Sequence, residues 1–487
     1  MNIKLLAQNT IIYGIGNVAL RASAFLLIPL YTHALSVKDF GILSTLLITM
    51  QLMIMLMTLG MQNTLLRFFK EYENKNLMNG LVGTSILINL LIGVLLILIL
   101  VIFFQSPFRI LLHAQYVYEY LLLTSLAALV QTITLQGMSY YRAKDKALRF
   151  TVISILSAIL LIVSNLILLL VFKLGIKGVF YSSIVSYSII LTFVAIDVFW
   201  RQTGFAIVIK IFPKLFRFGY PLAFSMLGQL VITSSSIYFI SYYQGPEVVA
   251  VYSLGYRFAM IMGIILTLPF RLAMQPFIFN NVDSPSIKET LSRLFDYFFI
   301  AFAFISFCVL LGARLLLPVI APPEYSGAFF LIPLLFPLLA CDGLFIFGEI
   351  LLHIENKTHI IGSTVGMCAI LSLILNYLLV PLMGCHGAIL ASVVACLCAG
   401  LILMRQGIKA FFFPINWFRT SFGGGLFVYF VIIVYFLFYK SQLVFYSGAF
   451  LAICLVPPFA KLINFFEDSE KAVIRQWFQM AKHAFGK

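Results

Sequence analysis

The stretch Thr10–Leu35, TIIYGIGNVALRASAFLLIPLYTHAL, decides how the rest of the chain is interpreted. It exceeds the roughly 20 apolar residues that cross a bilayer, yet Arg21 lies near its midpoint. A charged side chain at that depth costs about 2.5–3.5 kcal/mol on insertion scales, so it is kept where it faces a polar cavity or a partner. Asn17 and Gly14 precede Arg21 by one and two helical turns on the same face. We therefore expect this helix to be the first wall of a cationic cavity in a membrane transporter.

The composition is that of a polytopic membrane protein. Of 487 residues, 62% are hydrophobic and 10% are charged, against about 25% charged residues in soluble domains. The intervals between apolar runs are too short for an inserted soluble domain, and the first run is too long for a signal-peptide core, so we take it as a retained span. About fourteen spans are expected, at 10–35, 39–60, 80–104, 117–139, 148–172, 178–199, 217–241, 247–270, 294–318, 327–352, 358–381, 386–404, 417–438 and 442–463.

The distribution of basic residues gives the expected orientation. With the N-terminus in the cytoplasm, about three quarters of the 32 Lys and Arg residues fall on the cytoplasmic side, which predicts that both termini are cytoplasmic. The same loops explain the net charge of +15, so nucleic acid is not an expected partner. The seven cysteines lie mostly in apolar runs, where they are expected to be small core residues rather than metal ligands.

An internal repeat divides the chain. Polar segments in the first half recur about 210 residues later, at corresponding places in each set of six spans. The aligned pairs are Ser36–Ser44 with Gly245–Ser253, Arg142–Lys146 with His353–Lys357, Asn165 with Asn376, and Gly175–Ser183 with Gly384–Ser392. We expect an all-α fold of two parallel six-helix repeats around a central cavity plus two C-terminal helices. The expected parts are a first lobe at 1–210, a second lobe at 211–410, and the last two spans with an amphipathic cytoplasmic tail at 411–487.

Motifs for chemistry are missing from the sequence. No G-x-x-x-x-G-K-[ST], H-E-x-x-H or nucleophile elbow is present, and most carboxylates lie in loops. We therefore expect neither an enzyme nor a cofactor or metal site. An ion gradient, a membrane potential or the gradient of the substrate itself has to supply the energy.

Arg21 and Arg257 are the most informative polar residues at membrane depth. Each half carries one of them, and the guanidinium group is always charged and offers a fork of donors suited to phosphate oxygens. We expect them to bind an anionic headgroup, such as a pyrophosphate, between the halves. The alternatives are a structural ion pair, for example with Asp342, or snorkelling to an interface. Arg67 and Arg271 lie at the cytoplasmic ends of spans 2 and 8. They either form a cytoplasmic gate or headgroup collar, or they mark the membrane boundary.

The second half contains further polar candidates. Asp342 and Glu349 lie two turns apart on one face of span 10, which His353 continues, and they are candidates for ion coupling. An ion pair with Arg257 or a water-lined structural role is the alternative. Gln229 and Thr233 belong to a polar stripe of span 7 that would line a hydrated, sugar-compatible lumen or make ordinary interhelical hydrogen bonds. Pro29 predicts a bend in span 1.

Several segments resemble polysaccharide-type flippases, the Wzx-like members of the multidrug/oligosaccharidyl-lipid/polysaccharide exporter (MATE/MOP) superfamily. These are Asn9–Gly16 (NTIIYGIG), Pro29–Thr32 (PLYT), Leu35–Gly41 (LSVKDFG), Tyr141–Lys146 (YRAKDK) and Gly245–Ser253 (GPEVVAVYS). The resemblance extends over the whole chain. It is specific for the family and carries no information on the sugar.

The resemblance implies a two-lobed transporter in a bacterial inner membrane. It would move an undecaprenyl-pyrophosphate-linked oligosaccharide, for surface polysaccharide such as O-antigen or capsule, with a polysaccharide polymerase and chain-length proteins as further partners. Related lipid II flippases bind the pyrophosphate through arginines of the first and eighth spans, where Arg21 and Arg257 lie. The competing expectation is an ion-coupled multidrug or cation antiporter of the same superfamily. Such an antiporter needs cavity acids, and the first half offers only Asp197, near the end of span 6.

Overall fold

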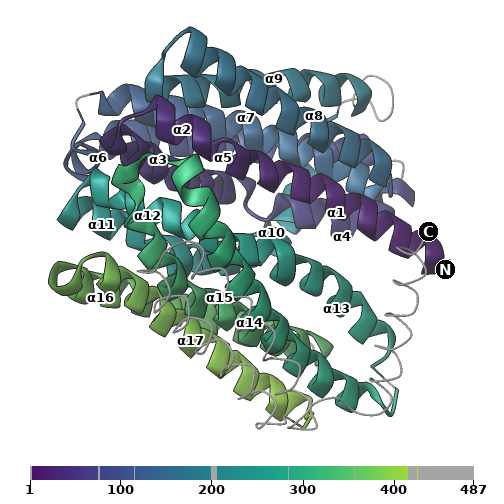
Figure 1. Ribbon diagram of the computed structural model, residues 1–487. Coiled ribbons are helices and arrows are strands. Elements are labelled where there is room, and N and C mark those ends of the chain that lie inside the picture. The colour runs from purple at the N-terminus through teal and green to yellow at the C-terminus, as the bar shows by residue number, and fades with distance from the viewer. Residues whose placement is uncertain are drawn as a thin grey trace, which may run out of the picture. The chain divides into compact units, whose positions relative to one another are not determined.

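The computed structural model describes residues 3–74, 77–114, 116–198, 206–282, 284–355, 357–414 and 425. Over these ranges the chain is helical and contains no strand (Figure 1). Two compact units are present. The first comprises Met1–Ile287 with Ala313–Phe412, and the second comprises Lys288–Gly312 with Phe413–Lys487.

The described residues contain 12 helical segments that are long and apolar enough to cross a membrane. They coincide with the first twelve expected spans, which confirms that part of the hydropathy interpretation. The two remaining expected spans, 417–438 and 442–463, and the expected amphipathic tail lie outside the described residues.

The helices of the first half follow the chain in order. They are α1 (Ile3–Leu26), α2 (Ile28–Ala34), α3 (Val37–Thr58), α4 (Met61–Asn74), α5 (Met78–Phe103), α6 (Gln105–Leu112), α7 (Val117–Ala143), α8 (Ala147–Leu166), η1 (Ile167–Val171) and α9 (Gly175–Ala195).

The elements of the second half also follow the chain in order. They are η3 (Ile209–Ile211), α10 (Phe212–Ser234), α11 (Ser236–Gln244), α12 (Pro246–Ala259), η4 (Gly263–Thr267), α13 (Leu268–Asn280), α14 (Ile287–Ile320), η5 (Pro323–Tyr325), α15 (Ala328–Ile354), α16 (Thr358–Met383) and α17 (Cys385–Ala410).

Two spans are interrupted. The first breaks at Leu27, and Pro29 occupies the first turn of the new helix α2, where its missing N–H is tolerated. A helix boundary therefore falls just before Pro29, where a bend was expected, while Leu27 keeps right-handed helical backbone. The second span breaks at Leu59 (φ 42°) and Gly60 (φ 70°) and continues as α4. The left-handed backbone at Gly60 packs directly against the backbone of Gly219 in α10, and a side chain at either position would overlap the other helix.

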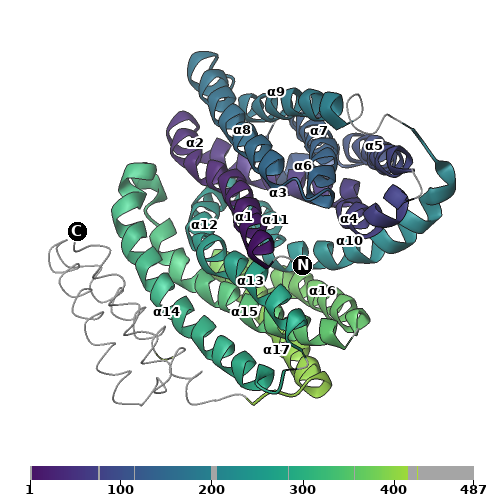
Figure 2. The same ribbon diagram turned by 90° about the vertical axis from the view of Figure 1, so that its right-hand side faces the viewer.

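Within the first unit, α3 of the first half packs along α12 of the second half (Figures 1 and 2). The closest approach is at Gly41, where an added methyl would overlap the carbonyl oxygen of Pro246 and lie 2.5 Å from its carbonyl carbon. Three hydrogen bonds join the halves at the same end of the spans. They are Thr32 Oγ1 to the Ile320 carbonyl (2.6 Å), Ser241 Oγ to the Leu111 carbonyl (2.6 Å), and the Thr49–Tyr238 hydroxyl pair (3.0 Å).

At the other end of the spans the halves diverge along one wall. Figures 1 and 2 show α4 of the first half and α13 of the second half apart. The opposite wall stays closed there, because α4 packs against α10. The halves are thus joined through α3 and α12 at one end of the spans and through α4 and α10 at the other.

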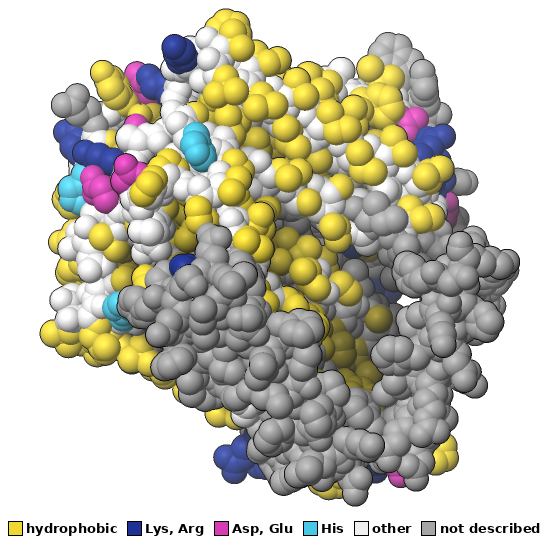
Figure 3. All heavy atoms as spheres, in the orientation of Figure 1, with side chains coloured by type: hydrophobic (Ala, Val, Ile, Leu, Met, Phe, Trp, Pro, Cys, Tyr) yellow, Lys and Arg dark blue, Asp and Glu magenta, His cyan; other side chains and the backbone are white. Residues whose placement is uncertain are grey.

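The surface matches the lipid environment. In Figure 3, hydrophobic side chains cover the middle of the face formed by α1, α8 and α9, and charged side chains gather toward both ends of these helices. Buried hydroxyls inside the spans are largely bonded to their own helix, as in Thr45 Oγ1 to the Gly41 carbonyl (3.2 Å) and Ser154 Oγ to the Phe150 carbonyl (2.8 Å). Such bonds satisfy polar groups where no water is present.

Candidate functional site

Arg257 lies on α12 where this helix contacts α3. Its guanidinium carbon is 5.6 Å from the centre of the Phe40 ring, and Phe40 packs edge-to-face on Tyr325 with ring centres 5.7 Å apart. The Arg257 side chain is partly buried and forms no ion pair with any acid that the structure describes. The alternative that Arg257 is neutralised by Asp342 is therefore not realised in this structure. A cation–π contact leaves the guanidinium donors free for an anion.

The helix α1 approaches the same place. Phe25 of α1 packs edge-to-face on Phe258, the neighbour of Arg257, with ring centres 5.6 Å apart. Arg21 lies one turn before Phe25 on the same helical face, and Asn17 lies one turn before Arg21. The structure gives the backbone of these two residues, and their side chains lie outside what it describes. The contact through Phe25 places the Arg21 turn of α1 next to the helix that carries Arg257.

Three hydroxyl groups near the α3–α12 contact are buried without a hydrogen-bond partner. They belong to Ser44 of α3, Ser253 of α12 and Tyr325 of η5, with exposed fractions of 2%, 3% and 1%. A buried hydroxyl without a partner costs about 1–3 kcal/mol. The packed α3–α12 contact therefore carries an unfavourable free energy from these three hydroxyls. Water would hydrogen-bond to them if the helices separated.

The second half carries a polar cluster on facing helices. Tyr256 of α12 packs against a hydrophobic cluster that contains Ile232 of α10 and Cys341 of α15, the chain neighbours of Thr233 and Asp342. Thr233 donates to the carbonyl of Gln229, one turn earlier, at 3.0 Å. Asp342 forms no ion pair with any described residue. The structure therefore brings Asp342, Thr233 and Gln229 to one region of this half.

Glu349 has two partners. Its carboxylate lies 3.5 Å from the guanidinium of Arg271 on α13 and 3.5 Å from Nε2 of His353, one turn along α15. Glu349 and His353 share a face of α15, as helical periodicity predicts, and Glu349 forms an ion pair with Arg271 in place of the Arg257 named in the sequence alternative. Arg67 is elsewhere, exposed on α4 with its guanidinium 5.8 Å from the Phe68 ring. Arg67 and Arg271 lie on α4 and α13, which Figures 1 and 2 show apart.

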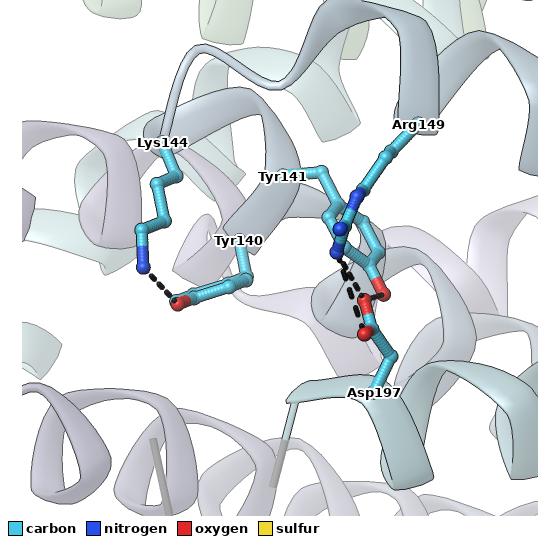
Figure 4. Close-up of polar contacts among 5 residues, drawn as sticks. All are labelled: Tyr140, Tyr141, Lys144, Arg149 and Asp197. Atoms are coloured by element: carbon cyan, nitrogen blue, oxygen red, sulfur yellow. Dashed lines mark hydrogen bonds and ion pairs between the residues drawn. The ribbon is translucent and has the colours of Figure 1, made fainter. Parts of the chain in front are cut away.

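Asp197, the span carboxylate of the first half, is engaged in a polar network (Figure 4). It forms an ion pair with Arg149 at 3.0 Å and accepts a hydrogen bond from the Tyr141 hydroxyl at 2.7 Å. These contacts come from the ends of α7 and α8 and the segment after α9. Arg149 and Tyr141 thus hold the Asp197 carboxylate at the ends of these helices.

The loop between α7 and α8 continues this network. Lys144 donates to the Tyr140 hydroxyl at 3.1 Å (Figure 4). Partial burial, with Arg149 and Lys144 nearby, lowers the pKa of Lys146. The YRAKDK segment singled out in the sequence is therefore a compact basic turn tied to the end of α9.

Sequence reasoning missed the aromatic side chains of this region. Phe25, Phe40 and Tyr325 form the contacts around Arg257, but an aromatic residue in an apolar span carries no positional signal by itself. Only Phe40 had such a signal in the sequence, because it lies within the Leu35–Gly41 segment that resembles the flippase family.

Comparisons with known proteins agree on the class of fold. A family model described as "Polysaccharide biosynthesis protein" matches residues 6–282. The search of curated proteins found no match. Among solved structures, a point mutant of the Vibrio cholerae MATE transporter VcmN has a TM-score of 0.61 at 16% identity, covering 83% of this chain and 97% of that one. A MOP superfamily transporter from Pyrococcus furiosus has a TM-score of 0.61 at 16% identity, covering 83% and 95%. An inward-facing MATE family transporter has a TM-score of 0.62 at 17% identity, covering 85% and 96%.

Proposed function

Because the chain belongs to the polysaccharide biosynthesis protein family and has the fold of MATE transporters, we propose that it is a lipid-linked oligosaccharide flippase. Its substrate is an oligosaccharide carried on undecaprenyl pyrophosphate. The substrate moves from the cytoplasmic to the periplasmic leaflet of a bacterial inner membrane, for surface polysaccharide such as O-antigen or capsule. Both termini are cytoplasmic, and polymerase and chain-length proteins receive the product.

Arg257 is the observation that carries this proposal. It is a partly buried guanidinium in the middle of a span, next to α1 with Arg21, and it has no described acidic partner. An unpaired arginine at membrane depth is kept for an anionic ligand, and pyrophosphate oxygens fit its fork of donors. Gln229 and Thr233 face the sugar as hydrogen-bonding groups, and Asp342 and Glu349 couple transport to an ion gradient.

The asymmetric opening of the halves supports a route for the amphiphile. With the orientation given by the basic loops, the α3–α12 contact is on the periplasmic side and the separation of α4 from α13 is on the cytoplasmic side. This arrangement suits an inward-open state. The headgroup enters between the two halves on this side, while the prenyl tail stays in the lipid.

Two parallel six-helix repeats and fourteen spans complete the proposed architecture. Aligned residues of the two halves have matching local structure, which supports the repeat. Asn165 and Asn376 are both fully buried, and each donates to the carbonyl four residues earlier at 2.8 Å. Gly175 and Gly384 both have left-handed backbone, with φ of 56° and 60°, at the starts of α9 and α17.

A flipping assay in proteoliposomes tests the proposal. The probe is a fluorescent undecaprenyl-pyrophosphate-linked oligosaccharide, and the readout is its protection from a membrane-impermeant quencher. Hydrogen bonds to charged groups contribute about 1.5–3 kcal/mol, so Arg257→Ala is expected to slow flipping by roughly 10- to 150-fold. Arg257→Lys keeps the charge but loses the fork and is expected to fall between the wild type and Arg257→Ala.

Arg405→Ala is the matched control, because Arg405 is an exposed arginine on α17 of the second half. It is expected to flip the probe at the wild-type rate. Wild-type flipping by Arg257→Ala, with normal amounts of folded protein in the vesicles, would disprove the role of Arg257. Transport of organic cations instead of the lipid-linked probe would assign the protein to the antiporter class.

A further inference from the structure

A groove of about 530 Å³ lies where α4 meets the first half of α10. It is lined by Phe68 of α4 and by Pro213, Lys214, Arg217 and Phe218 of α10. Its lining combines aromatic rings with two cations and includes no acidic residue. The groove is on the closed wall between the halves, away from the α1 and α12 helices that carry Arg21 and Arg257.

One of the two cations is fixed by its neighbours. Lys214 Nζ lies 4.7 Å from the centre of the Phe68 ring and 5.6 Å from that of Tyr72. It also donates to both carboxylate oxygens of Glu71, at 2.7 and 2.8 Å. Lys214 is therefore neutralised and holds Phe68 as one wall of the groove. Phe68 in turn packs edge-to-face on Phe218 at 5.5 Å, which closes the floor.

Arg217 differs from Lys214. Its side chain is exposed and has no carboxylate partner among the residues that the structure describes. A guanidinium with free donors at the mouth of a groove is suited to a phosphate group, which it can bind through two parallel hydrogen bonds.

An exposed aromatic stripe runs beside Arg217. Phe212, Phe216 and Tyr220 are spaced by four residues on α10, and their rings stack at 5.8 Å between successive centres. Their exposed fractions are 39%, 40% and 41%. Helical geometry puts Arg217 between this stripe and the groove residues Lys214 and Phe218. Exposed aromatic rings next to basic side chains mark the level where lipid headgroups meet acyl chains.

We propose that this groove binds the phosphate of an anionic phospholipid of the cytoplasmic leaflet, with Arg217 as its donor. The acyl chains lie along Phe212, Phe216 and Tyr220, and the headgroup rests between Arg217 and the Phe68 ring. The positive charge of the site complements the negative surface of that leaflet. The lipid is a resident of the closed wall, where Gly60 and Gly219 cross, and not the transported substrate.

Lipid binding to the purified full-length protein in detergent tests this proposal. The probes are phosphatidylglycerol, phosphatidylcholine and inorganic phosphate, and the readout is the number of bound lipids by native mass spectrometry together with the shift in melting temperature. The wild-type protein is expected to retain phosphatidylglycerol preferentially. Arg217→Gln is expected to weaken this binding about fivefold or more, since a basic residue near the surface contributes about that factor. Arg405→Gln, which changes an exposed arginine on α17, is the matched control and is expected to bind as the wild type does.

A second measurement needs no variant. A photoactivatable phosphatidylglycerol is expected to label peptides from 61–74 and 212–220 of the wild-type protein. Equal binding of phosphatidylglycerol and phosphatidylcholine, unchanged binding by Arg217→Gln, or labelling confined to other peptides would each overturn the proposal. Stabilisation by inorganic phosphate equal to that by phosphatidylglycerol would overturn the lipid as the source of the phosphate.

Discussion

The substitution Gly41→Ala is expected to push the two halves apart at the α3–α12 contact. The added methyl overlaps the Pro246 carbonyl oxygen and lies 2.5 Å from the carbonyl carbon, whereas real Cβ contacts essentially never fall below 3.0 Å. The backbones therefore have to separate by at least about 0.5 Å at the carbon, and further at the oxygen. Overpacking of this kind costs about 1–3 kcal/mol. Alanine raises the helix propensity of α3 by the same amount whether α3 is packed on α12 or separated from it. Only the steric clash therefore changes the equilibrium between these two states.

A shift of about 1–3 kcal/mol changes the ratio of joined to separated states by roughly 5- to 150-fold. Ser253 reports on this ratio, because it is 3% exposed on α12 and its hydroxyl has no partner. In a background in which the seven native cysteines are replaced, Ser253→Cys is expected to react slowly with a bulky thiol reagent in detergent. Adding Gly41→Ala is expected to raise the reaction rate by the factor given above.

Gly366→Ala on α16 is the matched control, since a methyl there meets no atom within 4 Å. It is expected to leave the reactivity of Ser253→Cys unchanged. If Gly41→Ala also leaves the thiol unreactive, in a protein that melts at the wild-type temperature, the close α3–α12 crossing does not exist in solution.

Three further outcomes follow from the contacts described. Ser44→Ala with Ser253→Ala removes two buried hydroxyls that have no partner, so the melting temperature is expected to rise and flipping to slow; a lower melting temperature would contradict this. Glu349→Gln breaks an ion pair with Arg271 whose side chains are 25% and 36% exposed, so it is expected to cost under about 1 kcal/mol. It is also expected to abolish the response of flipping to an imposed pH gradient, and an unchanged response would exclude Glu349 as the coupling group. Asp197→Asn is expected to lower thermal stability by about 0.5–1 kcal/mol without abolishing flipping, measured by melting and by the proteoliposome assay; loss of flipping would place this carboxylate in the transport path.

The candidate site shows how far sequence reasoning reaches. The face shared by Glu349 and His353 follows from helical periodicity, and the structure confirms it. The partner of Glu349 does not follow from periodicity, because Arg271 lies 78 residues earlier on another helix and its approach depends on how α13 packs beside α15. The same holds for Asp197, whose two partners come from α7 and α8.

The sequence by itself determined the membrane class, the positions of the first twelve spans and the family. Hydropathy needs no partner, because a span is apolar over its own length whatever it packs against. The tertiary structure alone decided that the second span breaks at Leu59–Gly60 to lie against Gly219, and that Gly41 lets α3 close on Pro246. A glycine can serve a turn or a helix crossing, and only the neighbouring backbone shows which role it has. The opening stretch keeps Arg21 as its central feature, and the Phe25–Phe258 contact is what brings that helix to Arg257.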